Sequence, residues 1–157
     1  MAVQGGEVKL SRAFHSYVKP EGRFDKRSSL VHGITQSSLL DKPSFEEIAP
    51  ELIKIVEGAV LVGYNISFDL GFLNEALRRH DLPQLKSPSL DVLPLTYGVL
   101  IKLGVDAAVL KMDYLILSGA MSLETLAKLL SMPVIKRHTA MGDALTSALV
   151  LLKLLSL

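Results

Sequence analysis

Residues 59–69 read AVLVGYNISFD, and this stretch decides how the sequence is interpreted. Residues 59–62 form a short, uniformly apolar run with β-branched members, which is typical of a strand covered on both faces. Apolar residues at helical spacing then predict a helix over 68–80. Because α/β folds place their ligands at the rim of the sheet where strands end, Asp69 is a candidate site residue.

Asn65 and Asp69 also have an ordinary structural interpretation. Asn65 can stabilise the turn between strand and helix, and Asp69 can be a first-turn acid favoured by the helix dipole. In the functional interpretation the same turn presents Asp69 to a ligand, and Phe68 anchors the helix. The segment alone leaves both interpretations open.

Upstream of this segment the sequence predicts strands and one long helix. Val3 and Val8 flank a turn over 4–7, and residues 13–18 alternate with period two, so we expect a hairpin or meander closed by Pro20. We expect a short helical turn over 28–33 that ends at Gly33. A helix is predicted over 43–56, with Ser44 as N-cap, acids Glu46 and Glu47 in its first turn, and a buried stripe of Ile48, Leu52, Ile55 and Val56.

Downstream, helices dominate. A strand over 89–93 runs into a helix that stops before Gly104, and Ser122 is expected to cap a helix over 123–130. The last helix is predicted over 141–155, whereas residues 107–117 have no clear assignment. Strands early and helices late predict a mixed α/β sandwich.

Composition narrows the class of protein. The chain has 157 residues, enough for one domain with its own core, and it contains no cysteine, which excludes thiolate metal sites and cysteine nucleophiles. No signal peptide or membrane span is evident, so we expect a cytoplasmic protein that does not contact a membrane. The formal net charge is only +1. A local basic rim can still serve nucleic acid, because nucleases that use carboxylates place acidic residues at the site.

Residues 138–144, which read HTAMGDA, form a second pattern. His138 is expected in the approach to the last helix and Asp143 in its first turns. A histidine near neutral pKa and a carboxylate suited to a divalent cation would then face one cleft. A single spacing of five between His and Asp is also common without function. His32, next to Gly33, is similarly open to a structural role or a substrate contact.

The order and spacing of these patterns resemble the DEDDh exonucleases, the family of the proofreading epsilon subunit of bacterial DNA polymerase III and of ribonuclease T. Five segments spread over nearly the whole chain carry the resemblance. Residues 14–20 resemble a strand of the family with its terminal proline, and residues 32–35 resemble its His-Gly-Ile-Thr segment. Residues 61–69, 91–93 and 138–144 resemble its second motif, its Asp-Thr-Leu strand and its third motif. The resemblance implies an α/β, ribonuclease H-like mixed sheet flanked by helices.

The resemblance also implies roles for individual residues. Asp69 and Asp143 would bind Mg²⁺ or Mn²⁺ in a two-metal site, and His138 would be the general base that deprotonates the attacking water. His32, Asn65 and Phe72 would contact substrate. The implied activity is hydrolysis of phosphodiester bonds at single-stranded or frayed 3′ ends, of DNA in the first place and RNA as a second choice.

One departure from the family concerns its first motif, Asp-x-Glu on the first strand. Residues 1–3 already resemble the second strand, so the central strand and its two acids are missing, and we expect an N-terminally incomplete single domain over 1–157 with impaired activity. Three explanations are open. The sequence is a fragment or has a wrongly assigned start, it is a degenerate homologue, or another copy or subunit supplies the strand.

Two other hypotheses compete with the exonuclease. One is a catalytically degenerate nucleic-acid-binding or assembly subunit on the same fold, with a second copy or a polymerase-type protein as its partner. The other is an α/β domain unrelated to nucleases, which requires the ordered motifs to be coincidence. The apolar stretch 100–119 is either a partner surface or core.

Overall fold

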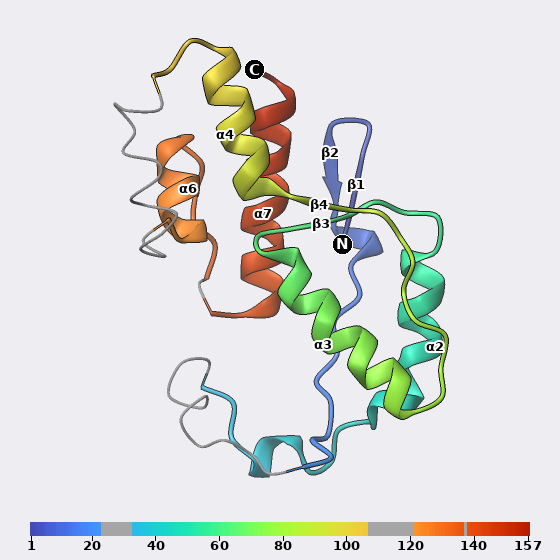
Figure 1. The fold of residues 1–157 in the computed structure, drawn as a ribbon. Helices are drawn as coiled ribbons and strands as arrows, with labels where there is room; N and C mark the ends of the chain where they lie inside the picture. The colour runs from blue at the N-terminus through green and yellow to red at the C-terminus, as the bar shows by residue number, and fades with distance from the viewer. Residues whose placement is uncertain (23–32, 107–120, 137) are drawn as a thin grey trace. The chain divides into compact units, whose positions relative to one another are not determined.

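The computed structural model describes residues 1–22, 33–106, 121–136 and 138–157 (Figure 1). It divides into two compact units, which are described separately below. The first unit comprises Met1–Ala13, Val62–Ser67 and Ser89–Leu157, and the second comprises Phe14–Leu61 and Phe68–Pro88. Over residues 45–102 helices alternate with short strands, and the chain as a whole combines helices and strands, as the expected α/β class requires.

The first unit begins with the expected hairpin. Strand β1 (Ala2–Gln4) pairs antiparallel with β2 (Glu7–Lys9), and Val3 lies opposite Val8. The two turn residues, Gly5 and Gly6, have φ of +61° and +76°. A two-residue hairpin turn of this hand needs positive φ at both positions, which glycine adopts without steric cost. The 3₁₀ helix η1 (Leu10–Arg12) follows at once.

A second two-stranded sheet joins β3 (Leu61–Gly63) to β4 (Ser89–Asp91). The expected strand at 59–62 therefore starts two residues later. Val60 is 57% exposed, so the prediction that the whole run is covered on both faces is wrong. From β4 the chain passes directly into α4 (Val92–Lys102), and the Asp91 side chain accepts a hydrogen bond from the Leu93 N–H at its start.

The core of the first unit forms around α7 (Ala140–Leu155). This helix lies beside α4 and α6 (Leu123–Leu129), as Figure 1 shows, and it also contacts β2. The buried core residues are Val92, Met121, Leu126, Ala127, Leu130, Val150, Leu151 and Leu154. Removing apolar area from water contributes about 25 cal/mol per Å², so this cluster is the main source of stability of the unit.

The second unit contains η2 (Ser37–Leu39), α2 (Phe45–Val56) and most of α3 (Ile66–Arg79), whose first two residues belong to the first unit. Its core is smaller, with Phe45, Ala49 and Leu77 buried. Ser44 caps α2 as expected. Ile48 and Leu52 pack against the core, but Ile55 is 44% exposed, so its predicted place in the buried stripe is wrong.

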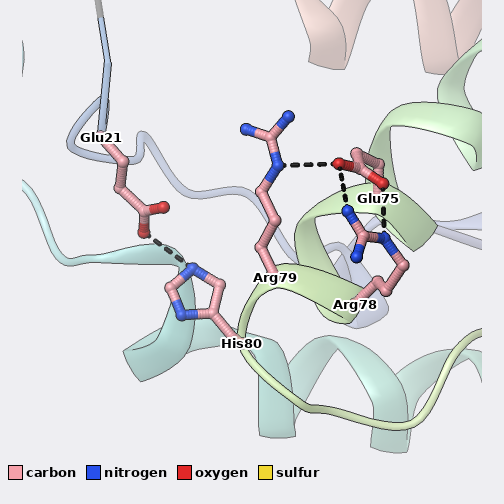
Figure 2. A network of polar contacts seen from close by, with 5 residues as sticks. All are labelled: Glu21, Glu75, Arg78, Arg79 and His80. Atoms are coloured by element: carbon pink, nitrogen blue, oxygen red, sulfur yellow. Dashed lines mark hydrogen bonds and ion pairs between the residues drawn. The ribbon is translucent and has the colours of Figure 1, made fainter.

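Charged side chains of the second unit form two groups of contacts near the end of α3 (Figure 2). Glu75 accepts from Arg78 Nε at 2.9 Å and from Arg79 Nε at 2.8 Å. His80 Nε2 lies 2.8 Å from Glu21 Oε1 and so ties the segment after Pro20 to the end of α3. The two arginines hold the pKa of Glu75 down at about 2, because both donate to its carboxylate.

The other sequence predictions concern residues 13–18, 28–33 and 100–119 and the possibility of a membrane span. Residues 13–18 form no strand, so that prediction is wrong. The next residue, Lys19, donates its N–H to the Pro43 carbonyl. The expected turn over 28–33 falls almost wholly outside the described residues, as does 107–117, together with most of 100–119. None of the helices in the described ranges is long and apolar enough to cross a membrane.

Candidate active site

The start of α7 brings two of the expected site residues into one unit. His138 lies two residues before the helix and Asp143 in its first turn, as the sequence predicts. Thr139 is the N-cap, and its carbonyl accepts from the Asp143 N–H at 2.9 Å. His138 is exposed and Asp143 is half-buried. A carboxylate here is favoured by the helix dipole, and an exposed imidazole can exchange protons with water.

The backbone around His138 is tightly constrained. His138 has φ of +59°, a left-handed conformation that is uncommon for residues other than glycine. The Thr139 hydroxyl donates to the Lys136 carbonyl at 2.8 Å and accepts from the Gly142 N–H at 3.2 Å. A Cβ at position 142 would lie 2.2 Å from the Lys136 carbonyl oxygen. The absence of a side chain at Gly142 therefore lets the segment before His138 approach the helix.

The turn between β3 and α3 carries Asn65, which is exposed and has φ of +52°. None of the hydrogen bonds or ion pairs between described residues involves the Asn65 side chain, so it does not hold the turn together by such a bond, as the sequence had suggested. The neighbouring Tyr64 makes a tertiary contact, because its hydroxyl donates to the Met121 carbonyl. Burial, with a smaller contribution from the charge of Asp91, raises the pKa of Tyr64. No sequence pattern indicated this contact.

Asp69 lies in the first turn of α3, within the second unit, and its side chain is exposed. Nearby protein atoms still displace part of its hydration, and this raises the pKa of Asp69, while a hydrogen bond from its own N–H lowers it. Phe68 and Phe72 are 61% and 66% exposed, with ring centroids 4.8 Å apart and planes inclined by 54°. The expectation that Phe68 anchors the helix is therefore wrong.

The candidate residues are thus distributed over both units. Asn65, His138 and Asp143 belong to the first, Asp69 and Phe72 belong to the second, and His32 lies outside the described residues. Carboxylate oxygens are the ligands that Mg²⁺ and Mn²⁺ prefer, so Asp69 and Asp143 fit such a cation by donor type. The described ranges contain no group of three or more His, Asp or Glu side chains that could hold a metal ion.

The family is shown by comparison with known proteins. A model of the RNase T type, described as exonuclease, matches residues 1–151, so the chain belongs to this exonuclease family, whose domain has a ribonuclease H-like α/β fold.

Individual relatives agree with this assignment. DNA polymerase III subunit epsilon of Escherichia coli is 42% identical over 73 residues, which is 45% of this chain and 30% of that protein. The same subunit from Buchnera aphidicola is 44% identical over 64 residues, or 41% of this chain and 26% of the relative. A PolC-type DNA polymerase III from Thermotoga maritima is 28% identical over 151 residues, 96% of this chain and 10% of the relative. The chain thus spans under a third of the length of these relatives.

Proposed function

We propose that the chain is the exonuclease-like domain, over residues 1–157, of a metal-dependent nuclease that shortens nucleic acid from its 3′ end. The observation that carries the proposal is the match to the exonuclease family over residues 1–151, together with His138 and Asp143 at the start of one helix. DNA is the preferred substrate of the proposal, because the relatives are named as DNA polymerase subunits. A polymerase-type partner and a cytoplasmic location go with it.

The proposed chemistry assigns one task to each residue. His138 accepts the proton of the attacking water on a ring nitrogen, which its exposed position at the helix start supports. Asp143 would bind the divalent cation on the side of the attacking water, and Asp69 would help to bind the second cation, each through carboxylate oxygens. A bound cation supplies positive charge that offsets the charge developing on the phosphate. The exposed rings of Phe68 and Phe72 offer apolar faces for the bases of the substrate, and we place Asn65 and His32 among its contacts.

The 157 residues contain no Asp-x-Glu sequence, so they carry two of the four acids that the family pattern uses. Two carboxylates hold a divalent cation less firmly than four, and His138 then has no activated water to deprotonate. We therefore propose that the 157-residue chain alone is impaired. The competing function, a nucleic-acid-binding or assembly subunit that does not cut, is favoured by the same observation.

The test is trimming of 5′-labelled single-stranded DNA in Mn²⁺, where a ladder of shortened labelled products reports attack at the 3′ end. We would compare the chain with a form extended at its N-terminus by a strand that carries Asp-x-Glu. The proposal expects faint trimming by the former, strong trimming by the latter, and loss of both with EDTA or with His138→Gln. Asp143→Asn should also abolish trimming, whereas Asp106→Asn, outside the site, should not.

The remaining outcomes decide between the functions. Strong trimming by the chain alone, lost in Asp143→Asn, would refute the impairment and keep the activity. If neither form trims DNA but both still bind the labelled strand, the proposed nuclease function fails and the function of a binding subunit is supported instead.

A further inference from the structure

Thr146 is a buried hydroxyl that links two segments of the first unit. It lies on α7, one turn after Asp143, and is 1% exposed. Its Oγ1 donates to the Gly142 carbonyl at 2.9 Å and accepts from the Ile135 N–H at 3.1 Å. Ile135 is three residues before His138, and Gly142 directly precedes Asp143. One hydroxyl group thus connects Ile135, which precedes His138 in the chain, to the helix turn that carries Asp143.

The ordinary role of a threonine inside a helix is weaker than this. A helical Thr commonly donates back to the carbonyl four residues earlier, and that local bond contributes little to tertiary structure. Thr96 on α4 is such a residue: it is fully buried, and its Oγ1 donates to the Val92 carbonyl at 2.7 Å. Thr146 makes the same local bond and, in addition, accepts from a backbone group outside its helix. The additional bond is what requires explanation.

We infer that Thr146 is a positioning residue, which holds the segment leading to His138 against α7 and so sets where the imidazole lies relative to Asp143. Two neighbouring features support the inference. Gly142 leaves room for the Lys136 carbonyl, and the Thr139 hydroxyl donates to that same carbonyl. Together with the bond from the Ile135 N–H to Thr146, these contacts hold residues 135 and 136 against the first turns of the helix. A left-handed residue such as His138 persists only where its surroundings hold it.

This inference rests on the proposed function only for its consequence in catalysis. If His138 is the general base, displacement of its backbone changes the distance over which it takes a proton, and small displacements are costly in rate. The geometric part of the inference is that the Thr146 hydroxyl sets the position of His138, and this part does not depend on the proposed function.

The decisive variants are Thr146→Val, which keeps the shape and removes the hydroxyl, and Thr146→Ser, which keeps the hydroxyl. Thr96→Val is the matched control, because it removes an equally buried hydroxyl that, among the described residues, makes only the local bond. By nuclear magnetic resonance of the 157-residue chain, we expect Thr146→Val to speed amide exchange at Ile135 roughly 5- to 10-fold. The imidazole signals of His138 should shift in the same variant, and Thr146→Ser should restore both.

Three outcomes would overturn the inference: His138 signals unchanged in Thr146→Val, an equal shift of those signals in Thr96→Val, or no recovery in Thr146→Ser. A kinetic arm uses the most active form found in the trimming assay. There Thr146→Val should lower kcat roughly 10- to 100-fold, the range typical for supporting partners of site residues, with little change in KM. If no form trims DNA, the proposed function fails, while the resonance measurements still decide the role of Thr146.

Discussion

Glu75 shows how a single side chain responds to its immediate neighbours. Its carboxylate accepts from Arg78 through both Nε and Nη2 and from Arg79 through Nε, all on the same helix (Figure 2). Residues three and four apart on a helix face each other, so all three charges meet without any tertiary contact. The pKa of Glu75 falls from 4.5 to about 2, chiefly through these hydrogen bonds.

This shift predicts how stability depends on pH. A carboxylate with a folded pKa below its unfolded one stabilises the fold above the unfolded value, and the effect is lost as pH falls toward the folded value. The stability lost in Glu75→Gln should therefore be largest above pH 4.5. This loss should decrease steadily as the pH is lowered from 4.5 to about 2. Urea unfolding of both proteins across this range measures it.

The matched control is Glu51→Gln, at an exposed α2 glutamate with no ion pair among the described residues. Its difference from wild type should vary less with pH. A high salt concentration should reduce the Glu75 effect, because exposed charges are screened. If the difference in unfolding free energy between wild type and Glu75→Gln grew on acidification, the lowered pKa of Glu75 would be contradicted.

At the scale of the element, capping sets where helices begin. Ser44 accepts from the Glu47 N–H at 3.3 Å, and the Glu47 carboxylate accepts from the Ser44 N–H at 2.6 Å. This reciprocal pair satisfies two backbone donors that the first turn leaves free. Hydrogen bonds from Ser44 also lower the pKa of Glu47. The first half of this cap, a hydroxyl that accepts from the N–H three residues later, recurs at Ser122 on α6 and at Thr139 on α7.

Removal of this cap should destabilise α2 measurably. We expect Ser44→Ala to lower the free energy of unfolding by about 1 kcal/mol, with the fastest gain in amide exchange in the first turn of the helix. Ser44→Thr retains the oxygen acceptor and should lose much less. Equal losses in the two variants would show that the side-chain oxygen is not what stabilises the helix start.

At the scale of the whole molecule, the division into two units with separate cores has a consequence for stability. Leu126 is fully buried in the first core and Leu77 in the second. Truncation of a buried leucine to alanine typically costs about 2–5 kcal/mol, through lost transfer free energy and the cavity that remains. Each core should therefore respond to its own substitution.

Hydrogen exchange measured by mass spectrometry can test this separation. Leu126→Ala should speed exchange mainly in α4, α6 and α7, and Leu77→Ala mainly in α2 and the later turns of α3. Uniform acceleration over the whole chain by either variant would mean that the two units unfold as one.

Much of the local structure was determined by the sequence alone. The hairpin around Gly5 and Gly6, the caps at Ser44 and Ser122, and the long helix that follows His138 were all predictable. These features depend on neighbours a few residues apart, and turn chemistry, capping and apolar periodicity report such neighbours directly. The placement of His138 and Asp143 on either side of a helix start was predictable for the same reason, whereas their roles stay a proposal.

Tertiary structure alone decided which apolar side chains are covered and which distant groups meet. Val60, Ile55 and Phe68 fit buried patterns in the sequence, yet they are exposed, because periodicity shows which residues share a face and not what packs against that face. The Tyr64 hydroxyl reaches a carbonyl 57 residues away, and the Thr146 hydroxyl reaches an N–H 11 residues away. Such hydrogen bonds form only after the core brings their segments together, since hydroxyl groups and backbone polar groups occur throughout the chain and carry no signal of their partner.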